Sequence, residues 1–184
     1  MSKANQRKIE GKAVVLGATG GLGSAVVMEL AKKERSVIAV TRNIQKAKKL
    51  FQDINVEIRH ADLMDQEETI KAVQGAEVVY HCANVNYTKW LKEFPIINNN
   101  ILSAVKEVGA NLVFADNLYM YGKMQGDKIS EEHPLNAEGK KGKLRIRLAK
   151  QILDTHSKGD IKAVIVRFGD FYGPNVANGF TKPL

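Results

Sequence analysis

The sequence predicts an α/β protein built on a doubly wound parallel sheet, and three observations support this fold class. A short apolar run, residues 12–16, ends at glycines spaced three apart, Gly17, Gly20 and Gly23. An apolar helical period follows them, and apolar runs alternate with helical periods through the rest of the chain. Repeated strand–helix–strand units form parallel sheets with helices on both faces. The length of 184 residues fits a single domain.

The glycine-rich stretch predicts a strand, a tight turn and a helix. Gly17 allows the chain to turn sharply, Gly20 allows the backbone to approach a phosphate, and Gly23 allows the helix to pack on the strand. The helix would turn its unpaired N–H groups toward an anion. We therefore predict a pyrophosphate-binding turn and a Rossmann-type fold. The spacing differs from G-x-G-x-x-G, so a glycine turn without a ligand stays open as an alternative.

The remaining elements follow from apolar periodicity and from turn signals. Asn43 and Asp65 are expected to cap two helices. A third helix is expected to begin at Pro95, which the first helical turn tolerates, and to end at Gly109. A later helix carries an apolar face at 144, 148 and 152. Expected strands after the first are residues 37–40, 56–58, 77–82, 111–115 and 161–167.

Composition and charge narrow the class of protein. No run approaches the ~18 apolar residues of a membrane span, and residues 1–11 read as a polar leader, so we expect a cytoplasmic protein without membrane contact. The four histidines lack metal-ligand spacing, and the single Cys82 is expected to be a small core side chain. The net charge of +8 arises partly from basic clusters at 46–49 and 140–147. We interpret these clusters first as solvated helix faces and second as groups that attract an anionic cofactor or substrate. We expect no nucleic-acid binding.

Polar residues gather where the predicted strands end. Thr19, Arg42, Asp62 and Asn84 each follow a strand, and ligands bind at the carboxyl ends of such strands. At the end of the second strand, a carboxylate would bind the free ribose hydroxyls, whereas an arginine accommodates a ribose phosphate. Arg42 therefore favours NADP(H) over NAD(H), and an arginine that lies along the surface is the alternative.

Taken together, these motifs resemble the short-chain dehydrogenase/reductase superfamily, in its extended epimerase/dehydratase branch and the related atypical branch, over roughly residues 12–175. The stretch 17–23 looks like the cofactor turn of that family, and Asp62-Leu63 looks like its adenine-contacting pair. Tyr121-Gly122 and residues 167–174 match two further signatures. The resemblance implies cofactor contacts at Gly17, Thr19, Gly20, Gly21, Leu22, Gly23, Arg42, Asp62, Leu63, Cys82, Ala83 and Asn84.

The sequence departs from the family pattern at the expected catalytic positions. Asn117 stands where the family has a Ser or Thr that polarises the substrate oxygen. The family's Tyr-x-x-x-Lys pair is missing, because alignment on the helix puts Gly142 and Ile146 near those places. Lys140, Lys141 and Lys143 are read as solvated. The chain is also short: residues 12–167 are expected to form the dinucleotide-binding domain, and residues 168–184 the start of a truncated substrate region, so that the substrate subdomain is largely missing.

The resemblance implies an NADP(H)-binding, epimerase/dehydratase-like oxidoreductase, with NAD as the second choice of cofactor. It would act on a carbonyl or alcohol of a small or nucleotide-linked substrate, with Asn117 as the donor to the substrate oxygen. A non-catalytic NADP(H) sensor or partner-binding protein is the alternative, and an inactive remnant of a longer enzyme is a third. A homodimer would pair through the helices around 95–108 and 143–156.

Overall fold

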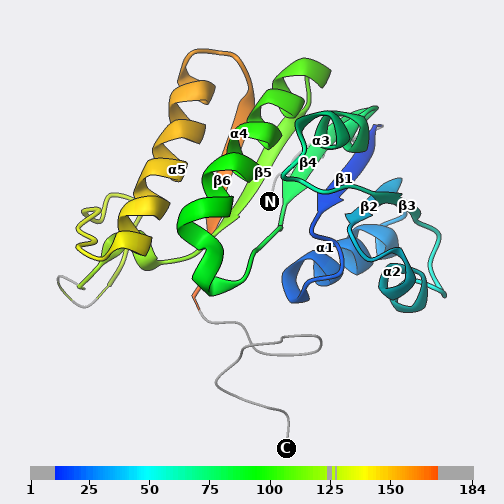
Figure 1. The fold of residues 1–184 in the computed structure, drawn as a ribbon, viewed down its shortest axis with the longest axis horizontal. Helices are drawn as coiled ribbons and strands as arrows, with labels where there is room; N and C mark the ends of the chain where they lie inside the picture. The colour runs from blue at the N-terminus through cyan, green and yellow to red at the C-terminus, as the bar shows by residue number, and fades with distance from the viewer. Residues whose placement is uncertain (1–10, 124–125, 127, 170–184) are drawn as a thin grey trace, which may run out of the picture.

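Six parallel strands form one sheet at the centre of the molecule. The computed structural model describes residues 11–123, 126 and 128–169. The strand order is β3-β2-β1-β4-β5-β6, which is the doubly wound order that the sequence predicts. Figure 1 shows β1 and β4 side by side in the middle of the sheet. The strands are β1 (Lys12–Leu16), β2 (Val37–Thr41), β3 (Glu57–His60), β4 (Ala76–His81), β5 (Asn111–Asp116) and β6 (Lys162–Arg167).

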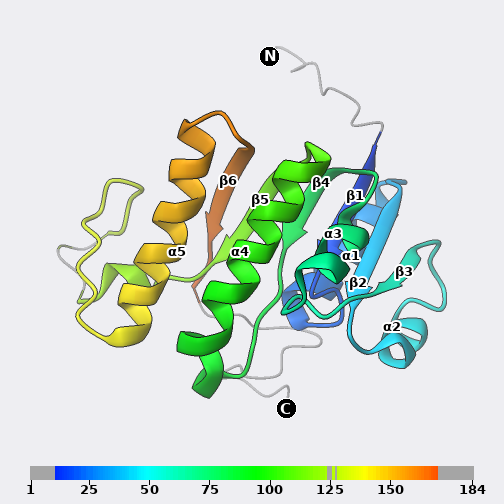
Figure 2. The ribbon, with the colours of Figure 1, turned by 45° about the horizontal axis from the view of Figure 1, so that its top comes forward.

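Helices cover both faces of the sheet. They are α1 (Gly21–Lys32), α2 (Ile44–Leu50), α3 (Gln66–Val73), α4 (Trp90–Val108) and α5 (Lys140–Ser157), with short 3₁₀ turns η1 (Tyr87–Lys89) and η2 (Tyr119–Tyr121). In Figure 2, α3, α4 and α5 lie in front of the sheet. The other face packs against α1 and α2. The single-domain α/β prediction is therefore confirmed.

Alternate residues of β1 show how the two layers form. Val14 and Leu16 enter the larger apolar cluster with α3, α4 and α5, whereas Val15 enters the smaller cluster with α1 and α2. Successive strand side chains point to opposite faces, so a strand buried on both faces must be apolar throughout. The strand order reverses between β1 and β4, and this reversal opens a crevice at the carboxyl edge of the sheet.

Helix caps predicted from the sequence are present. The side chain of Asn43 accepts a hydrogen bond from Lys46 N–H, and Asp65 accepts one from Glu68 N–H. Gly109 ends α4 in a left-handed conformation, with φ of 68°. Among the described residues, no helix is both long enough and apolar enough to cross a bilayer.

The predicted start of α4 was wrong. The helix begins at Trp90, so that Pro95 lies in its interior, where proline cannot donate to the carbonyl four residues earlier. The first turn of α4, before Pro95, is stabilised by packing, because Trp90 and Phe94 are buried against Leu144 and Leu148 of α5. Tertiary burial therefore outweighs the local preference for proline in a first turn.

Candidate functional site

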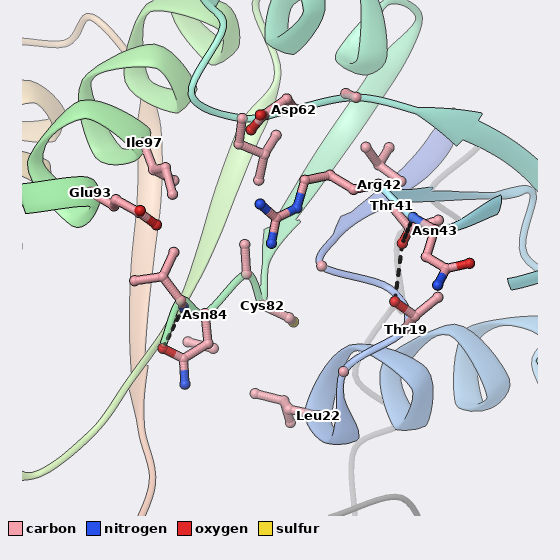
Figure 3. Close-up of a pocket in the computed structure, with 18 of the residues that line it drawn as sticks. Thr19, Leu22, Thr41, Arg42, Asn43, Asp62, Cys82, Asn84, Glu93 and Ile97 are labelled. Carbon is pink, nitrogen blue, oxygen red and sulfur yellow. Dashed lines mark hydrogen bonds between the residues drawn. The ribbon is translucent and has the colours of Figure 1, made fainter. Parts of the chain in front are cut away.

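A cavity of about 910 Å³ lies at the carboxyl edge of the sheet, where the strand order reverses. It has the size of a typical cofactor or ligand site. Figure 3 shows its walls, which come from the glycine turn, the ends of β2 and β4, the segment after β3, and α4. The lining includes Asn117 and every residue for which the sequence predicts a cofactor contact except Gly23: Gly17, Thr19, Gly20, Gly21, Leu22, Arg42, Asp62, Leu63, Cys82, Ala83 and Asn84.

Two glycines of the turn are required by close backbone packing. Gly17 has a φ of +76°, and a Cβ there would lie 2.5 Å from the Cα of Ala83 after β4. Gly23 lies inside α1, and a Cβ there would overlap the Gly17 carbonyl oxygen. Gly23 therefore brings the helix close to the turn instead of lining the cavity.

Gly20 differs from these two because it faces open space. It precedes α1 with φ of −78° and ψ of 167°, and a Cβ would find only the Gly17 carbonyl oxygen, at 3.4 Å. No side chain caps α1, and its first turn carries no acidic residue. The unpaired N–H groups of this helix start are therefore available to an anion in the cavity.

The glycine turn is tied to the end of β2. The N–H groups of Gly17 and Ala18 donate to the carbonyl oxygen of Val40, at 3.2 and 3.1 Å. The hydroxyls of Thr19 and Thr41 lie 3.0 Å apart and share a hydrogen bond, which Figure 3 draws. These contacts join the glycine turn and the end of β2 into one wall of the cavity.

Arg42 follows β2 and projects into the cavity. Figure 3 shows its guanidinium directed toward the space between Asp62 and Cys82. The guanidinium thus points into the cavity, and the residue is solvent-exposed. The arrangement places a permanent positive charge beside the glycine turn, where it can bind a ligand phosphate.

The segment after β3 is held by hydrogen bonds from two helices. Glu68 of α3 accepts from Asp62 N–H at 2.8 Å, and Asn100 of α4 donates to the Leu63 carbonyl at 2.9 Å. The role of Asn100 was not predicted from the sequence. The run 98–100 is polar throughout in the sequence, yet Asn98 and Asn100 are buried. Their spacing with Ile97 and Ile101 on the apolar face of α4 was the available signal.

The end of β4 places three predicted residues against the cavity. Cys82 lies just after the strand, and burial raises the pKa of its thiol to about 12, so it stays uncharged. This agrees with the interpretation of Cys82 as a packing residue. Ala83 is in close contact with Gly17, and Asn84 bonds locally, its side-chain oxygen accepting from Val85 N–H at 2.9 Å.

The end of β5 carries an ion pair that the sequence analysis did not predict. Arg145 of α5 is buried, and its Nε donates to Asp116 Oδ1 at 2.7 Å while its Nη2 contacts the same oxygen. Burial raises the pKa of the Asp116 carboxyl, against the lowering effect of the Arg145 charge. The prediction that Arg145 belongs to a solvated basic cluster was wrong, because its side chain is buried. It adjoins Leu144 and Leu148 on the buried face of the helix, which was the sequence signal.

Asn117 lies directly after this pair, at the edge of the cavity. Its N–H donates to Asp116 Oδ1 at 2.8 Å, and its side-chain oxygen accepts from Tyr119 N–H at 3.0 Å. The amide nitrogen is the part of the side chain left to donate to a ligand. Asn117 also lines a second cavity of about 760 Å³, whose walls include Tyr87 and Lys141.

Positions 142 and 146, near which the resemblance places the tyrosine and lysine of the family, lie on α5. Gly142 is buried, and a Cβ there would overlap Ala137 and lie 2.6 Å from the Tyr119 carbonyl oxygen. Ile146 is half-buried. A tyrosine at position 142 would therefore not fit this backbone. Lys141 packs against an aromatic ring, with its Nζ 2.7 Å from the centroid of Tyr87.

No metal centre is present in the described part of the chain, where no group of three or more potential ligands gathers. The resemblance of residues 167–174 to the family's arginine-to-Tyr-Gly-Pro segment falls mostly on residues 170–174, which lie outside the described residues.

Comparison with known proteins identifies a matching family model and several relatives. The family model described as the NAD dependent epimerase/dehydratase family matches residues 13–183. An isoflavone reductase homolog P3 of Arabidopsis thaliana is 28% identical over 182 residues, covering 94% of this chain and 54% of its own length. UDP-glucose 4-epimerase 2 of the same plant is 27% identical over 176 residues, covering 84% of this chain and 50% of its own length. The chain thus spans about half the length of these relatives.

Solved structures agree in fold. UDP-glucose 4-epimerase of Thermus thermophilus, in complex with NAD, superposes with a TM-score of 0.79 at 22% identity, covering 92% of this chain and 58% of that one. The UDP-Glc/GlcNAc 4-epimerase of Campylobacter jejuni superposes with a TM-score of 0.76 at 17% identity, covering 85% of this chain and 52% of that one. Because the family model matches nearly the whole chain, the resemblance seen in the sequence is confirmed: the chain belongs to the NAD dependent epimerase/dehydratase family.

Proposed function

We propose that this chain binds NADP(H) in the larger cavity and transfers a hydride to or from a carbonyl or alcohol of a small or nucleotide-linked substrate. The observation that carries the proposal is the single cavity that joins the glycine turn, Arg42 and Asn117. The glycine turn would hold the pyrophosphate at the start of α1. The nicotinamide ring, when bound, supplies the hydride chemistry.

The choice of NADP(H) over NAD(H) rests on Arg42. Its guanidinium points into the cavity at the end of β2, where a ribose 2′-phosphate would lie. We expect Arg42→Ala to weaken NADP⁺ binding by roughly 10- to 150-fold, because a charge-assisted hydrogen bond contributes about 1.5–3 kcal/mol. NAD⁺ binding should change little. Calorimetric titration with both dinucleotides measures the ratio, and an equal effect on both would contradict the role of Arg42.

At the reacting end of the cavity, the side-chain amide N–H of Asn117 would donate a hydrogen bond to the substrate oxygen. The hydrogen bond from Tyr119 N–H fixes the orientation of this side chain. The second cavity, which also meets Asn117, offers room for the rest of the substrate, with the aromatic side chain of Tyr87 and the lysine side chains of α5 in its wall. The test follows the absorbance of the reduced nicotinamide while sugar nucleotides and simple ketones are offered as substrates. Activity that Asn117→Ala leaves intact would refute this role.

A non-catalytic dinucleotide sensor is the second candidate, and the packing of Gly142 favours it. A side chain at position 142, near which the resemblance places the acid/base tyrosine of the family, would overlap Ala137 and crowd the Tyr119 carbonyl. Tight dinucleotide binding without turnover of any substrate tested would support the sensor. Reproducible turnover abolished by Asn117→Ala would exclude it.

We also propose that α4 and α5 pair two copies of the chain. Ile96 and Leu153 are exposed large apolar residues on these two helices. Light scattering gives the mass in solution, and Leu153→Glu should convert a dimer to a monomer. A wild-type protein that is monomeric at all concentrations would contradict the pairing.

A further inference from the structure

The ion pair at the end of β5 leaves two buried polar atoms without partners. Asp116 Oδ1 receives all the donors, from Arg145 Nε, Arg145 Nη2 and Asn117 N–H. Among the described residues, Asp116 Oδ2 and Arg145 Nη1 have no hydrogen-bond partner. The two residues are 4% and 3% exposed, and both lie in the wall of the larger cavity. Buried polar atoms without partners are uncommon, and a polar group of a bound ligand is one way to satisfy them.

The charge balance of the pair limits what that group can be. Within the buried pair one guanidinium and one carboxylate cancel, and the other charge that acts on Asp116 belongs to Arg167 of β6, which is only half-buried. The rings of Phe94, Phe114 and Trp90 lie 4.9, 5.3 and 5.6 Å from Arg145 Cζ. An added anion would leave a net buried charge in these apolar surroundings, which is costly. A neutral group that accepts one hydrogen bond and donates another would satisfy both free atoms.

The place of the pair in the sheet indicates which part of a ligand reaches it. In the order β2-β1-β4-β5, Arg42 follows β2 and Asp116 ends β5. Three strand spacings of about 4.8 Å put these ends roughly 14 Å apart. With the ribose phosphate at Arg42 and the pyrophosphate at the glycine turn, the nicotinamide end of the cofactor extends toward β5.

We propose that Asp116 and Arg145 bind the carboxamide of the nicotinamide ring, with Arg145 Nη1 donating to the carboxamide oxygen and Asp116 Oδ2 accepting from its N–H. This inference rests on the proposed function. A carboxamide is neutral, so it leaves the charge balance of the pair unchanged. It carries an acceptor and a donor side by side, one for Arg145 Nη1 and one for Asp116 Oδ2. The pair would thus position the ring beside Asn117.

The ring must displace side chains that now cover the pair. Trp90 lies against the guanidinium, and its indole N–H donates to the Val85 carbonyl at 3.1 Å. Both residues also line the cavity. Because Trp90 is the single tryptophan of the chain, its fluorescence reports the arrival of the ring. We expect NADP⁺ to change this emission more than 2′-phospho-ADP-ribose, which lacks the ring.

The test compares three ligands that differ only at the ring: NADP⁺, its nicotinic acid analogue, which has a carboxylate in place of the carboxamide, and 2′-phospho-ADP-ribose. NAD⁺, its nicotinic acid analogue and ADP-ribose form a parallel series that does not depend on Arg42. We expect the wild-type protein to prefer the amide to the acid by at least tenfold. Asp116→Asn replaces Oδ2 by an N–H donor and removes the negative charge, so the preference should shift toward the acid by tenfold or more.

This shift in preference separates a binding role of Asp116 from a structural one. A folding defect would weaken all three ligands together, whereas a shift of the acid-to-amide ratio, with 2′-phospho-ADP-ribose unchanged, requires contact at the ring. Arg145→Lys, which keeps the charge, should lower the amide preference in the same way. An unchanged ratio in both variants, a wild-type protein without amide preference, or equal fluorescence changes would overturn the inference. Failure of every ligand in both series would instead refute the proposed function.

Discussion

Gly20→Ala separates the role of the glycine turn in binding from its role in folding. Gly20 has dihedral angles that alanine adopts readily, and a Cβ would meet only the Gly17 carbonyl oxygen, at 3.4 Å. We therefore expect the melting temperature of the variant to stay within a few degrees of the wild type, because the roughly 0.4–1 kcal/mol that Gly→Ala gains at a compatible site opposes the preference of an N-cap for glycine over alanine.

The same methyl group would stand where a pyrophosphate approaches the start of α1. Displacing the phosphate by a methyl radius removes at least one charge-assisted hydrogen bond, worth about 1.5–3 kcal/mol. The dissociation constant for NADP⁺ should therefore rise by roughly 10- to 150-fold. Gly23→Ala is the matched control. Its Cβ would overlap the Gly17 carbonyl oxygen, and overpacking should cost about 1–3 kcal/mol of stability.

Thermal unfolding and calorimetric titration of both variants provide the assay. For a chain of this size, each kcal/mol lost by Gly23→Ala should lower the melting temperature by roughly 2–4 °C. Wild-type affinity for NADP⁺ in Gly20→Ala would show that no phosphate lies against this residue. A wild-type melting temperature in Gly23→Ala would refute the packing argument for α1.

Three further predictions concern buried positions. Burial, and then the nearby charge of Arg145, lower the pKa of His81 to about 3. An unfolded histidine takes up a proton below about pH 6.5. As the pH is lowered from about 6.5 to about 3, the free energy of unfolding should therefore fall by up to about 1.4 kcal/mol per pH unit. Urea titrations over this range should show a shallower pH dependence for His81→Phe, and an equal slope would contradict the assignment. Gly142→Ala should destabilise by about 1–3 kcal/mol, since its Cβ would crowd the Tyr119 carbonyl, and an unchanged melting temperature would be evidence against that contact. Asn100→Ala should cost about 1–3 kcal/mol by leaving the Leu63 carbonyl unpaired, whereas Asn100→Asp keeps the shape but lacks the donor and should cost no less in a urea titration.

Local sequence signals were enough to predict the sheet and most of the cavity. Buried parallel strands are continuous apolar runs, and their carboxyl ends meet at one edge, so residues as distant in sequence as Thr19 and Asn84 line one cavity. Gly17 was predictable because a left-handed turn that also contacts Ala83 leaves no room for a side chain.

The features that were missed depend on contacts between elements far apart in the chain. The start of α4 is set by packing of Trp90 and Phe94 on α5, which outweighs the preference of Pro95 for a first turn. Arg145 is buried only because Asp116 lies across from it on β5. A charge paired across 29 residues cannot be told from a solvated charge by composition, because burial of the ion pair is decided by the fold.

Titration of the unmodified chain with NADP⁺ and NAD⁺ tests the central claim most directly, namely that the cavity between the glycine turn and Asn117 is a dinucleotide site. The account predicts saturable binding of both, with NADP⁺ tighter because Arg42 meets the ribose phosphate. Binding of neither dinucleotide would contradict the account, and tighter binding of NAD⁺ would contradict the role given to Arg42.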